Sequence, residues 1–267
     1  MTMLNNVRVA ILSCGWLGFA LAADLKKKGA LINAGYRNPD MLDELKKAGF
    51  NPFILHCDPD CQGPKLSSFF HSDILIITLP FKRQFKDAFY YLKQINGILR
   101  QVKSSPIKHL IFTSSTGIYD GLSGHVDTQA SLCLDKKRVA ALAACEKAII
   151  EFSACHASIL RLAGLYGPHR ELGRFLAGKV VKRPAKQPVN IAHQQLCIDR
   201  IIHCINKKIM VNPASTKLNH IENVVENRHP SREELYTHEA LKLGLSCPIF
   251  EDKSPLNEKN YRIVLDG

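Results

Sequence analysis

The sequence has no apolar run of the ~18 to 20 residues that a membrane-spanning helix needs, and it has no Cys-x-x-Cys pair. Its nine cysteines lack the paired spacing of a structural zinc site, and its eleven histidines show no metal-ligand spacing. Internal repeats and low-complexity tracts are also absent. These absences predict a cytoplasmic protein with reduced thiols, without membrane contact and without a metal.

One segment imitates a secretory signal peptide. Arg8 precedes the apolar stretch Val9 to Leu21, and Ala20-Leu21-Ala22 places small residues where a signal peptidase would cut. The same residues also form a complete pattern of strand, glycine turn and helix, which cleavage would destroy. We therefore expect this segment to be retained.

Acidic residues are few beside basic ones. The 267 residues include 24 Asp and Glu against 36 Lys and Arg, a formal charge of +12. Such a surplus suits nucleic acid, a membrane surface or an anionic small ligand. The basic residues are spread along the chain without a helix-turn-helix or RNA-recognition signature, so nucleic acid is not expected. An anionic small molecule is the preferred partner, with Arg37, Arg138 and Arg170 as the cations that contact it.

The chain alternates between strand and helix patterns. A strand at Val7 to Leu12, a turn, a helix at Phe19 to Lys28 and a strand at Leu31 to Gly35 form a βαβ unit. Further helices are predicted at 39–48, 84–100, 134–152, 193–207 and 232–243, and further strands at 52–56, 74–78, 109–113, 158–162 and 218–221. Continuous apolar strands are typical of a parallel sheet covered on both faces. The pattern predicts an α/β, Rossmann-like doubly wound parallel sheet with a small C-terminal substrate lobe.

The first turn reads Ser13-Cys14-Gly15-Trp16-Leu17-Gly18. A dinucleotide-binding turn needs glycine where the backbone twists, where it approaches the pyrophosphate and where helix packs on strand. Ser13 stands at the first position, Gly15 and Gly18 at the other two. Since a strand precedes the turn and a helix follows, we predict nucleotide binding, the alternative being a tight turn without a ligand. Trp16 is expected to pack over the cofactor, and the other predicted cofactor contacts are Leu17, Leu79, Pro80 and Thr113.

The end of the second strand predicts which cofactor is bound. A carboxylate there holds the ribose 2'-hydroxyl of NAD, and an arginine accommodates the 2'-phosphate of NADP. The sequence is Ala34-Gly35-Tyr36-Arg37-Asn38, with no carboxylate before Asp40. Arg37 therefore favours NADP over NAD, the alternative being an ordinary solvated arginine.

Four collinear segments resemble the extended or atypical short-chain dehydrogenase/reductases known as the NAD-dependent epimerase/dehydratase family. They are 112–119 (FTSSTGIY), 160–168 (LRLAGLYGP), 189–193 (VNIAH) and 223–231 (NVVENRHPS). The first turn also nearly matches the GxGWLG start of one branch of that family. The resemblance spans essentially the whole chain. It implies an oxidoreductase or epimerase that transfers a hydride between nicotinamide and a small substrate, with nucleotide sugars or other sugar derivatives as candidates.

The resemblance also implies catalytic residues. Members use a Ser or Thr to hold the reacting oxygen and a Tyr-x-x-x-Lys pair to supply the proton. Ser115 matches the serine. The pair does not match, because the family pattern places Arg138 at the tyrosine and Leu142 at the lysine, and residues 134–152 contain no tyrosine. An arginine, with a pKa above ~12, is a poor proton donor but can bind an anion.

Three interpretations of the missing pair stay open. In the first, the chemistry persists with another acid, for which Tyr119 and His193 are the nearest candidates. In the second, Arg138 anchors a phosphate or carboxylate of cofactor or substrate and a different reaction is run. In the third, catalysis is lost and the protein is an NADP-sensing regulator. The first two together are preferred to the third.

Substrate contacts and domain boundaries follow from the same resemblance. The expected substrate-binding residues are Thr116, Tyr166, His169, Arg170 and His193. An exposed basic loop is the alternative for His169 and Arg170, and a helix cap is the alternative for His193. We expect an NADP-binding domain at 1–165, rejoined by 189–210, and a substrate lobe at 166–188 and 211–267. Many relatives dimerise through two helices, here 84–100 and 134–152, so a homodimer is a further expectation.

Overall fold

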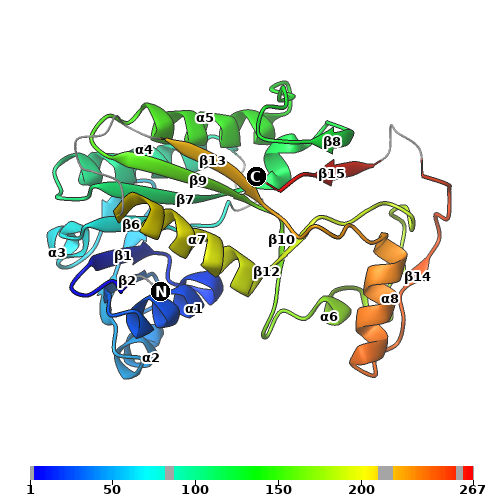
Figure 1. The fold of residues 1–267 in the computed structure, drawn as a ribbon, viewed down its shortest axis with the longest axis horizontal. Coiled ribbons are helices and arrows are strands. Elements are labelled where there is room, and N and C mark those ends of the chain that lie inside the picture. The colour runs from blue at the N-terminus through cyan, green and yellow to red at the C-terminus, as the bar shows by residue number, and fades with distance from the viewer. Residues whose placement is uncertain (1–2, 82–86, 210–218, 257–260, 267) are drawn as a thin grey trace. The chain divides into compact units, whose positions relative to one another are not determined.

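The computed structural model describes residues 3–81, 87–209, 219–256 and 261–266. A seven-stranded sheet has the order β13-β9-β7-β6-β1-β2-β3 (Figure 1). Its strands are β1 Arg8–Leu12, β2 Leu31–Tyr36, β3 Asn51–Ile54, β6 Ile74–Ile77, β7 His109–Ser115, β9 His156–Leu162 and β13 His220–Val224. The predicted α/β, Rossmann-like fold with a parallel sheet is confirmed.

Strand β1 lies inside the sheet, next to the central strand β6. It pairs in parallel with β2 on one side and with β6 on the other, so that Val9 lies beside both Ile32 and Ile74. From β1 the chain builds outward through β2 and β3, then returns to build the other side through β6 and β7. The carboxyl ends of β1 and β6 therefore border the point where the strand order reverses, which is where open α/β sheets bind ligands.

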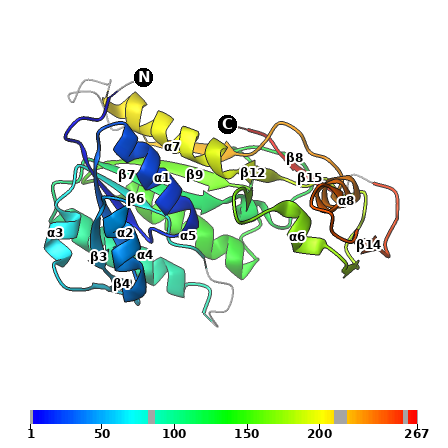
Figure 2. The ribbon, with the colours of Figure 1, turned by 90° about the horizontal axis from the view of Figure 1, so that it is seen from below.

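Four long helices cover the sheet. Helices α1 (Trp16–Lys27) and α7 (Gln194–Ile209) lie over one face, and α4 (Tyr90–Lys103) and α5 (Lys137–Glu151) lie over the other (Figure 2). This double cover explains why all four residues of β6 are buried. None of the helices in the described ranges is both long and apolar enough to cross a membrane.

Most predicted elements are present with shifted ends. The helix predicted at 39–48 divides into a 3-10 turn η1 (Pro39–Met41) and α2 (Leu42–Lys47). The helix predicted at 84–100 is α4; residues 84–86 lie outside the described ranges, as does Leu218 of the strand predicted at 218–221. The prediction missed α3 (Leu66–Phe70) and the hairpin of β4 (His56–Cys57) and β5 (Cys61–Gln62). Elements this short show no periodicity that a sequence can reveal.

The chain forms two compact units. The first unit comprises 1–114, 134–160 and 198–221, and the second unit comprises 115–133, 161–197 and 222–267. The chain passes from the first unit to the second within β7, β9 and β13, and it returns to the first unit before α5 and within α7. The second unit thus includes 115–133, 161–165 and 189–197, which the sequence prediction placed with the nucleotide domain. The two units alternate along the sequence because the segments that follow β7, β9 and β13 belong to the second unit.

The second unit contains three short pairs of parallel strands and two helices that pack together. β10 (Gly164–Tyr166) pairs with β12 (Ile191–His193), β8 (Gly124–Val126) with β15 (Arg262–Val264), and β11 (Val180–Val181) with β14 (Ile249–Phe250). Helix α6 (Leu172–Leu176) packs against α8 (Arg232–Lys242). A Cβ atom on Gly173 would lie 2.3 Å from the carbonyl oxygen of Glu239, so glycine is required for this approach.

Candidate functional site

The turn after β1 has the geometry of a phosphate-binding turn. Ser13, at the position of the first glycine, has a φ of 70°, in the left-handed region that glycine adopts most easily. The hydroxyl of Thr78 shares its one proton between the carbonyl oxygens of Leu12 (3.0 Å) and Ser13 (2.8 Å). These two bonds fasten the twisted turn to the end of β6.

The two glycines of the turn play different parts. A Cβ on Gly18 would lie 3.1 Å from Ile11 Cγ2 and 3.2 Å from both the Ser13 carbonyl and the Thr78 hydroxyl. Gly18 therefore allows α1 to pack closely on β1. A Cβ on Gly15 would meet nothing nearer than 3.9 Å, so Gly15 leaves open space above the turn. These are the separate roles of the last and middle glycines in a dinucleotide turn.

Helix α1 begins at Trp16 directly after this turn, with Gly15 as its N-cap. No side chain caps the helix, and its first turn contains no acidic residue. The first amides of a helix lack internal acceptors, and the helix dipole adds partial positive charge there. The N-terminal end of α1 is therefore suited to bind an anion.

A cavity of about 740 Å³ opens beside this turn in the first unit. Its size lies in the usual range for small-molecule sites. Five of the predicted cofactor residues line it: Ser13, Gly15, Arg37, Leu79 and Pro80. The prediction missed other residues of the wall, which are Leu12, Gly35, Tyr36, Asn38, Pro39, Leu55, His56, Cys57, Asp58 and Gln94.

Arg37 and Asp58 lie together on the wall of this cavity. Their side chains form an ion pair with 3.7 Å between a guanidinium nitrogen and a carboxylate oxygen, and they are 65% and 46% exposed. No carboxylate stands between β2 and Asp40 in the sequence. The carboxylate that pairs with Arg37 is that of Asp58, which comes from beyond β3, the strand that pairs in parallel with β2. The sequence analysis predicted a strand that ends at residue 56. Because neighbouring parallel strands end at the same edge of a sheet, that prediction could have placed Asp58 near Arg37.

The remaining predicted cofactor residues lie around the turn. Trp16, Leu17 and Gly18 form the first turn of α1, where Leu17 is buried and Trp16 half-buried. Thr113 Oγ1 donates a 3.1 Å hydrogen bond to the carbonyl of Ile77, which joins β7 to β6. None of these four residues lines the cavity.

Arg138 lies in the first turn of α5, near the segment that carries Leu79 and Pro80. Its guanidinium carbon is 5.5 Å from the centre of the Phe81 ring. Phe81 packs edge-on against Tyr91, whose hydroxyl donates a 2.6 Å hydrogen bond to the Leu79 carbonyl. Arg138, which the sequence analysis predicted at the position of the family tyrosine, thus stacks on the segment that supplies two residues of the cavity wall. On the same helix, Glu146 accepts a 2.5 Å hydrogen bond from buried Ser114, a pair that the prediction missed.

Ser115 and Tyr119 begin the second unit, in and beside the 3-10 turn η2 (Thr116–Tyr119). The half-buried Ser115 caps the turn, because its Oγ accepts a 3.0 Å hydrogen bond from the amide of Gly117. Tyr119 is fully buried. Its hydroxyl donates to Asn223 Oδ1 (2.7 Å) and accepts from Arg161 (2.7 Å). This geometry favours a structural role for the Tyr119 hydroxyl.

Two asparagines, in two of the four segments that resemble the epimerase/dehydratase family, form hydrogen bonds with β15 and the residue after it. Asn190 accepts a 2.8 Å hydrogen bond from the Val264 amide and donates a 2.9 Å bond to the Arg262 carbonyl. Asn223 donates a 2.9 Å bond to the Leu265 carbonyl. These segments therefore fasten β15 within the second unit, a role that the resemblance did not suggest.

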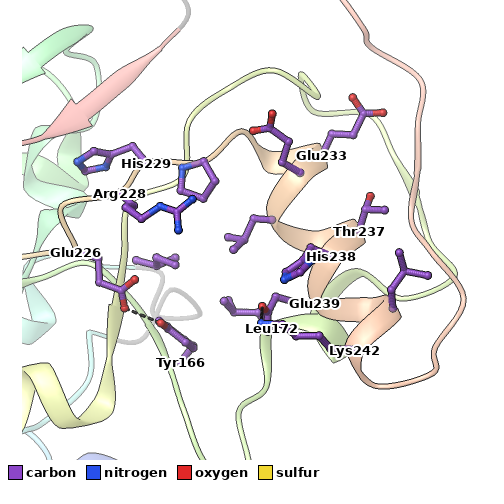
Figure 3. Close-up of a pocket in the computed structure, with 15 residues that line it drawn as sticks. Tyr166, Leu172, Glu226, Arg228, His229, Glu233, Thr237, His238, Glu239 and Lys242 are labelled. Carbon is purple, nitrogen blue, oxygen red and sulfur yellow. Dashed lines mark hydrogen bonds and ion pairs between the residues drawn. The ribbon is translucent and has the colours of Figure 1, made fainter.

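A second cavity, of about 1090 Å³, lies within the second unit (Figure 3). Helix α8 supplies one wall through Glu233, Thr237, His238, Glu239 and Lys242, and the segment after β13 supplies Glu226, Arg228 and His229. Burial and the charge of His125 lower the pKa of His229, so its ring favours the neutral form. Both acidic and basic groups thus line this cavity, and it suits a polar ligand.

Two predicted substrate residues, Tyr166 and His193, meet at the edge of this cavity. The Tyr166 hydroxyl donates a 2.6 Å hydrogen bond to Glu226 (Figure 3), and the His193 amide donates a 3.2 Å bond to the same oxygen. Their rings pack edge to face, with centres 5.1 Å apart. Burial and the bond to Glu226 raise the pKa of Tyr166, so the phenol keeps its proton. Glu226, which the prediction missed, organises this group.

The other predicted substrate residues occupy separate positions. His169 and Arg170 are exposed in a tight turn closed by a 2.9 Å hydrogen bond from the Arg170 amide to the Gly167 carbonyl. Thr116 is buried at the start of η2. None of the three lines either cavity.

Comparison with known proteins gives relatives in sequence and in fold. The chain is 30% identical over 249 residues to Protein YeeZ of Escherichia coli, in both strain K12 and strain O157:H7, covering 92% of this chain and 87% of the relative. No protein-family model matches the chain.

Several solved structures share the fold. A conserved protein of unknown function from Silicibacter pomeroyi superposes with a TM-score of 0.71 at 20% identity, covering 98% of this chain and 90% of that one. The UDP-glucuronic acid 4-epimerase of Bacillus cereus, solved with NAD, gives 0.74 at 13% identity, covering 97% and 89%. The ADP-L-glycero-D-manno-heptose-6-epimerase of Helicobacter pylori gives 0.73 at 13% identity, covering 97% and 87%. The fold is thus one that nucleotide-sugar epimerases use.

Proposed function

We propose that this chain, which belongs to the protein family of Escherichia coli YeeZ, binds NADP(H) in the cavity of the first unit and acts as an oxidoreductase or epimerase on a small anionic substrate. The observation that carries the proposal is the turn after β1. Its left-handed Ser13, open Gly15 and closely packed Gly18 reproduce the three requirements of a dinucleotide turn.

Each part of the cofactor has a group suited to it. The uncapped N-terminus of α1 and the open space at Gly15 would hold the pyrophosphate. Arg37 would hold the 2'-phosphate, and Leu79 and Pro80 line the same cavity. When bound, NADP supplies or accepts a hydride at its nicotinamide. NADP is proposed rather than NAD because a guanidinium is suited to bind a phosphate through two hydrogen bonds.

The second unit would supply the substrate site. Tyr166, Glu226 and His193 bring a phenol, a carboxylate and an imidazole together beside the larger cavity. The Nδ1 atom of His193 accepts a 3.1 Å hydrogen bond from the Gln195 amide, so the ring proton of the neutral form lies on Nε2. We propose that Tyr166 and His193 bind substrate hydroxyls, that Ser115 holds the reacting oxygen, and that Arg138 stabilises negative charge.

A second candidate function is a catalytically silent NADP sensor. Two observations favour it: α5 contains no tyrosine, and the Tyr119 hydroxyl is engaged with Asn223 and Arg161 in a buried network. Under this hypothesis the second cavity would bind an effector or a partner rather than a substrate.

Cofactor titration followed by a turnover screen tests both functions. Calorimetry should give a lower Kd for NADPH than for NADH, and Arg37→Ala should remove that preference. Arg174→Ala, at a similarly exposed arginine, is the matched control. Equal affinities for the two cofactors, or a preference unchanged in Arg37→Ala, would contradict NADP specificity.

Turnover separates the enzyme from the sensor. NADPH oxidation or sugar-nucleotide epimerisation that is lost in Ser115→Ala supports the enzyme. Tight NADPH binding without turnover across a broad substrate panel supports the sensor. Homodimerisation through α4 and α5 stays a prediction, which light scattering of the purified protein tests.

A further inference from the structure

Two cysteines face each other across the short hairpin β4–β5 in the first unit. Cys57 and Cys61 are directly paired residues of the antiparallel ladder, and their sulfur atoms lie 2.6 Å apart. Directly opposed residues of an antiparallel pair have Cα atoms within the range that a disulfide spans. Both thiols are free in this structure. The hairpin therefore holds a dithiol that needs little backbone movement to close.

The two thiols differ in access. Cys57 is half-buried and lines the proposed cofactor cavity, whereas Cys61 is 5% exposed. The hydrogen bond with Cys57, together with burial, raises the pKa of Cys61, so this thiol keeps its proton. A solute that enters the cavity therefore reaches Cys57 first. Cys14, Cys145 and Cys197 are also buried, but none of them lines this cavity.

The hairpin is anchored on helix α4. Gln94 donates a hydrogen bond to the Cys57 carbonyl, and Arg100 forms an ion pair with Asp60. A Cβ on Gly97 would lie 2.7 Å from the Pro59 carbonyl, so the loop packs directly against the helix. These contacts hold the loop close to helix α4.

We propose that Cys57 and Cys61 form a reversible disulfide in response to hydroperoxides, and that this disulfide lowers the affinity of the cavity for NADPH. The second part rests on the proposed cofactor site. In the first step the Cys57 thiolate attacks hydrogen peroxide and forms a sulfenic acid, releasing hydroxide. In the second step the Cys61 sulfur attacks the sulfenic sulfur, its proton passes to the departing hydroxyl group, a disulfide forms and water leaves. The two thiols lose two electrons and two protons, and the peroxide is reduced to two molecules of water.

Asp58 links the dithiol to the cofactor. It directly follows Cys57, it pairs with Arg37 at 3.7 Å, and it accepts a hydrogen bond from the Tyr90 hydroxyl. A 2'-phosphate has to replace Asp58 as the partner of Arg37. Because a disulfide restricts the conformations of the loop it closes, the oxidised hairpin holds Asp58 against Arg37. NADH lacks the 2'-phosphate, so its affinity is not affected by this competition.

Peptide mass spectrometry tests the chemistry independently of nucleotide binding. Trypsin releases residues 48–65 as one peptide that contains both cysteines. After treatment with hydrogen peroxide we expect this peptide to lose the mass of two hydrogens and to regain it with dithiothreitol. In Cys61→Ser the reaction should stop at a sulfenic acid on Cys57, which dimedone traps. Cys133→Ser, at another half-buried cysteine, should behave as the unsubstituted protein.

Cofactor titration tests the consequence. Oxidation should raise the Kd for NADPH by roughly three- to tenfold, the range expected for one weakened charged hydrogen bond, and change the Kd for NADH less than twofold. Cys57→Ser and Asp58→Asn should each abolish the oxidation effect. A peptide that does not oxidise, or an oxidised protein with unchanged NADPH affinity, would overturn the proposal while leaving the cofactor site intact. Failure of the reduced protein to bind either nucleotide would overturn both proposals.

Discussion

The carboxylate of Asp58 lies 3.7 Å from the guanidinium of Arg37, at the wall of the proposed cofactor cavity. Arg37 directly follows β2 and Asp58 directly follows β4, and both side chains are about half exposed or more. In the proposed NADP complex, Asp58 would compete with the 2'-phosphate for the same cation. Under that proposal, the preference for NADP over NAD depends on both side chains and not on Arg37 alone.

Removing the charge of Asp58 should strengthen NADPH binding. Exposed ion pairs contribute about 0.2–1 kcal/mol, so Asp58→Asn should lower the Kd for NADPH by roughly 1.5- to 5-fold and leave that for NADH nearly unchanged. Asp60→Asn is the control, since Asp60 lies in the same loop and pairs with Arg100. The competition is refuted if Asp58→Asn weakens NADPH binding, or if both variants have the same effect.

Ser13 should be replaceable by glycine and not by a β-branched residue. The left-handed conformation costs non-glycine residues roughly 1–2 kcal/mol, while glycine loses about 0.5–1 kcal/mol through chain entropy. Ser13→Gly should therefore leave the free energy of unfolding within about 1 kcal/mol of the unsubstituted protein. Ser13→Val should lower it by about 1–2 kcal/mol or more, because β-branched residues rarely adopt positive φ. Urea denaturation measures both, and equal stabilities of the two variants would show that the turn is not left-handed.

The Tyr119 hydroxyl should matter for stability. Tyr119→Phe removes the hydrogen bonds to Asn223 and Arg161 inside the second unit. Leaving such buried groups without this partner costs about 1–3 kcal/mol, so thermal unfolding should occur at a lower temperature. Tyr261→Phe, at a half-buried tyrosine of the same unit, is the comparison. If Tyr119 were instead the proton donor, kcat would fall steeply without a loss of stability.

The pair Asp73 and Arg8 should make stability depend on pH in acid. Burial raises the pKa of Asp73, but hydrogen bonds from the Arg8 amide (2.8 Å) and side chain, together with the charges of Arg8 and Lys108, outweigh it and lower the pKa. Because the folded-state pKa lies below the unfolded value, this contribution is complete above about pH 4. It is lost as the pH falls through the folded-state pKa.

Asp73→Asn measures that contribution. The variant should be less stable than the unsubstituted protein at pH 6, and the difference should shrink toward pH 3. Asp43→Asn, at a carboxylate that is 84% exposed, should show no such trend. A difference that grows on acidification would reverse the sign of the assigned shift.

The sequence by itself determined the fold class and located the turn to which we assign anion binding. Continuous apolar strands alternating with helices have one common arrangement, a parallel sheet covered on both faces, and the structure confirms it. The spacing of Gly15 and Gly18 between a strand and a helix was enough to locate the turn, because its requirements are local to the backbone. Arg37 could be found for the same reason, since it directly follows β2.

Tertiary structure decided which side chains meet. Asp58 reaches Arg37 only because β3 pairs with β2, and Cys61 faces Cys57 only because two strands of two residues each form a hairpin. Tyr119, a candidate proton donor by motif, is bonded to Asn223, which lies 104 residues further along the chain. Such contacts depend on sheet order and on long-range packing, and neither leaves a periodic signal in the sequence. The sequence thus identified the candidate groups, and the fold determined what each of them contacts.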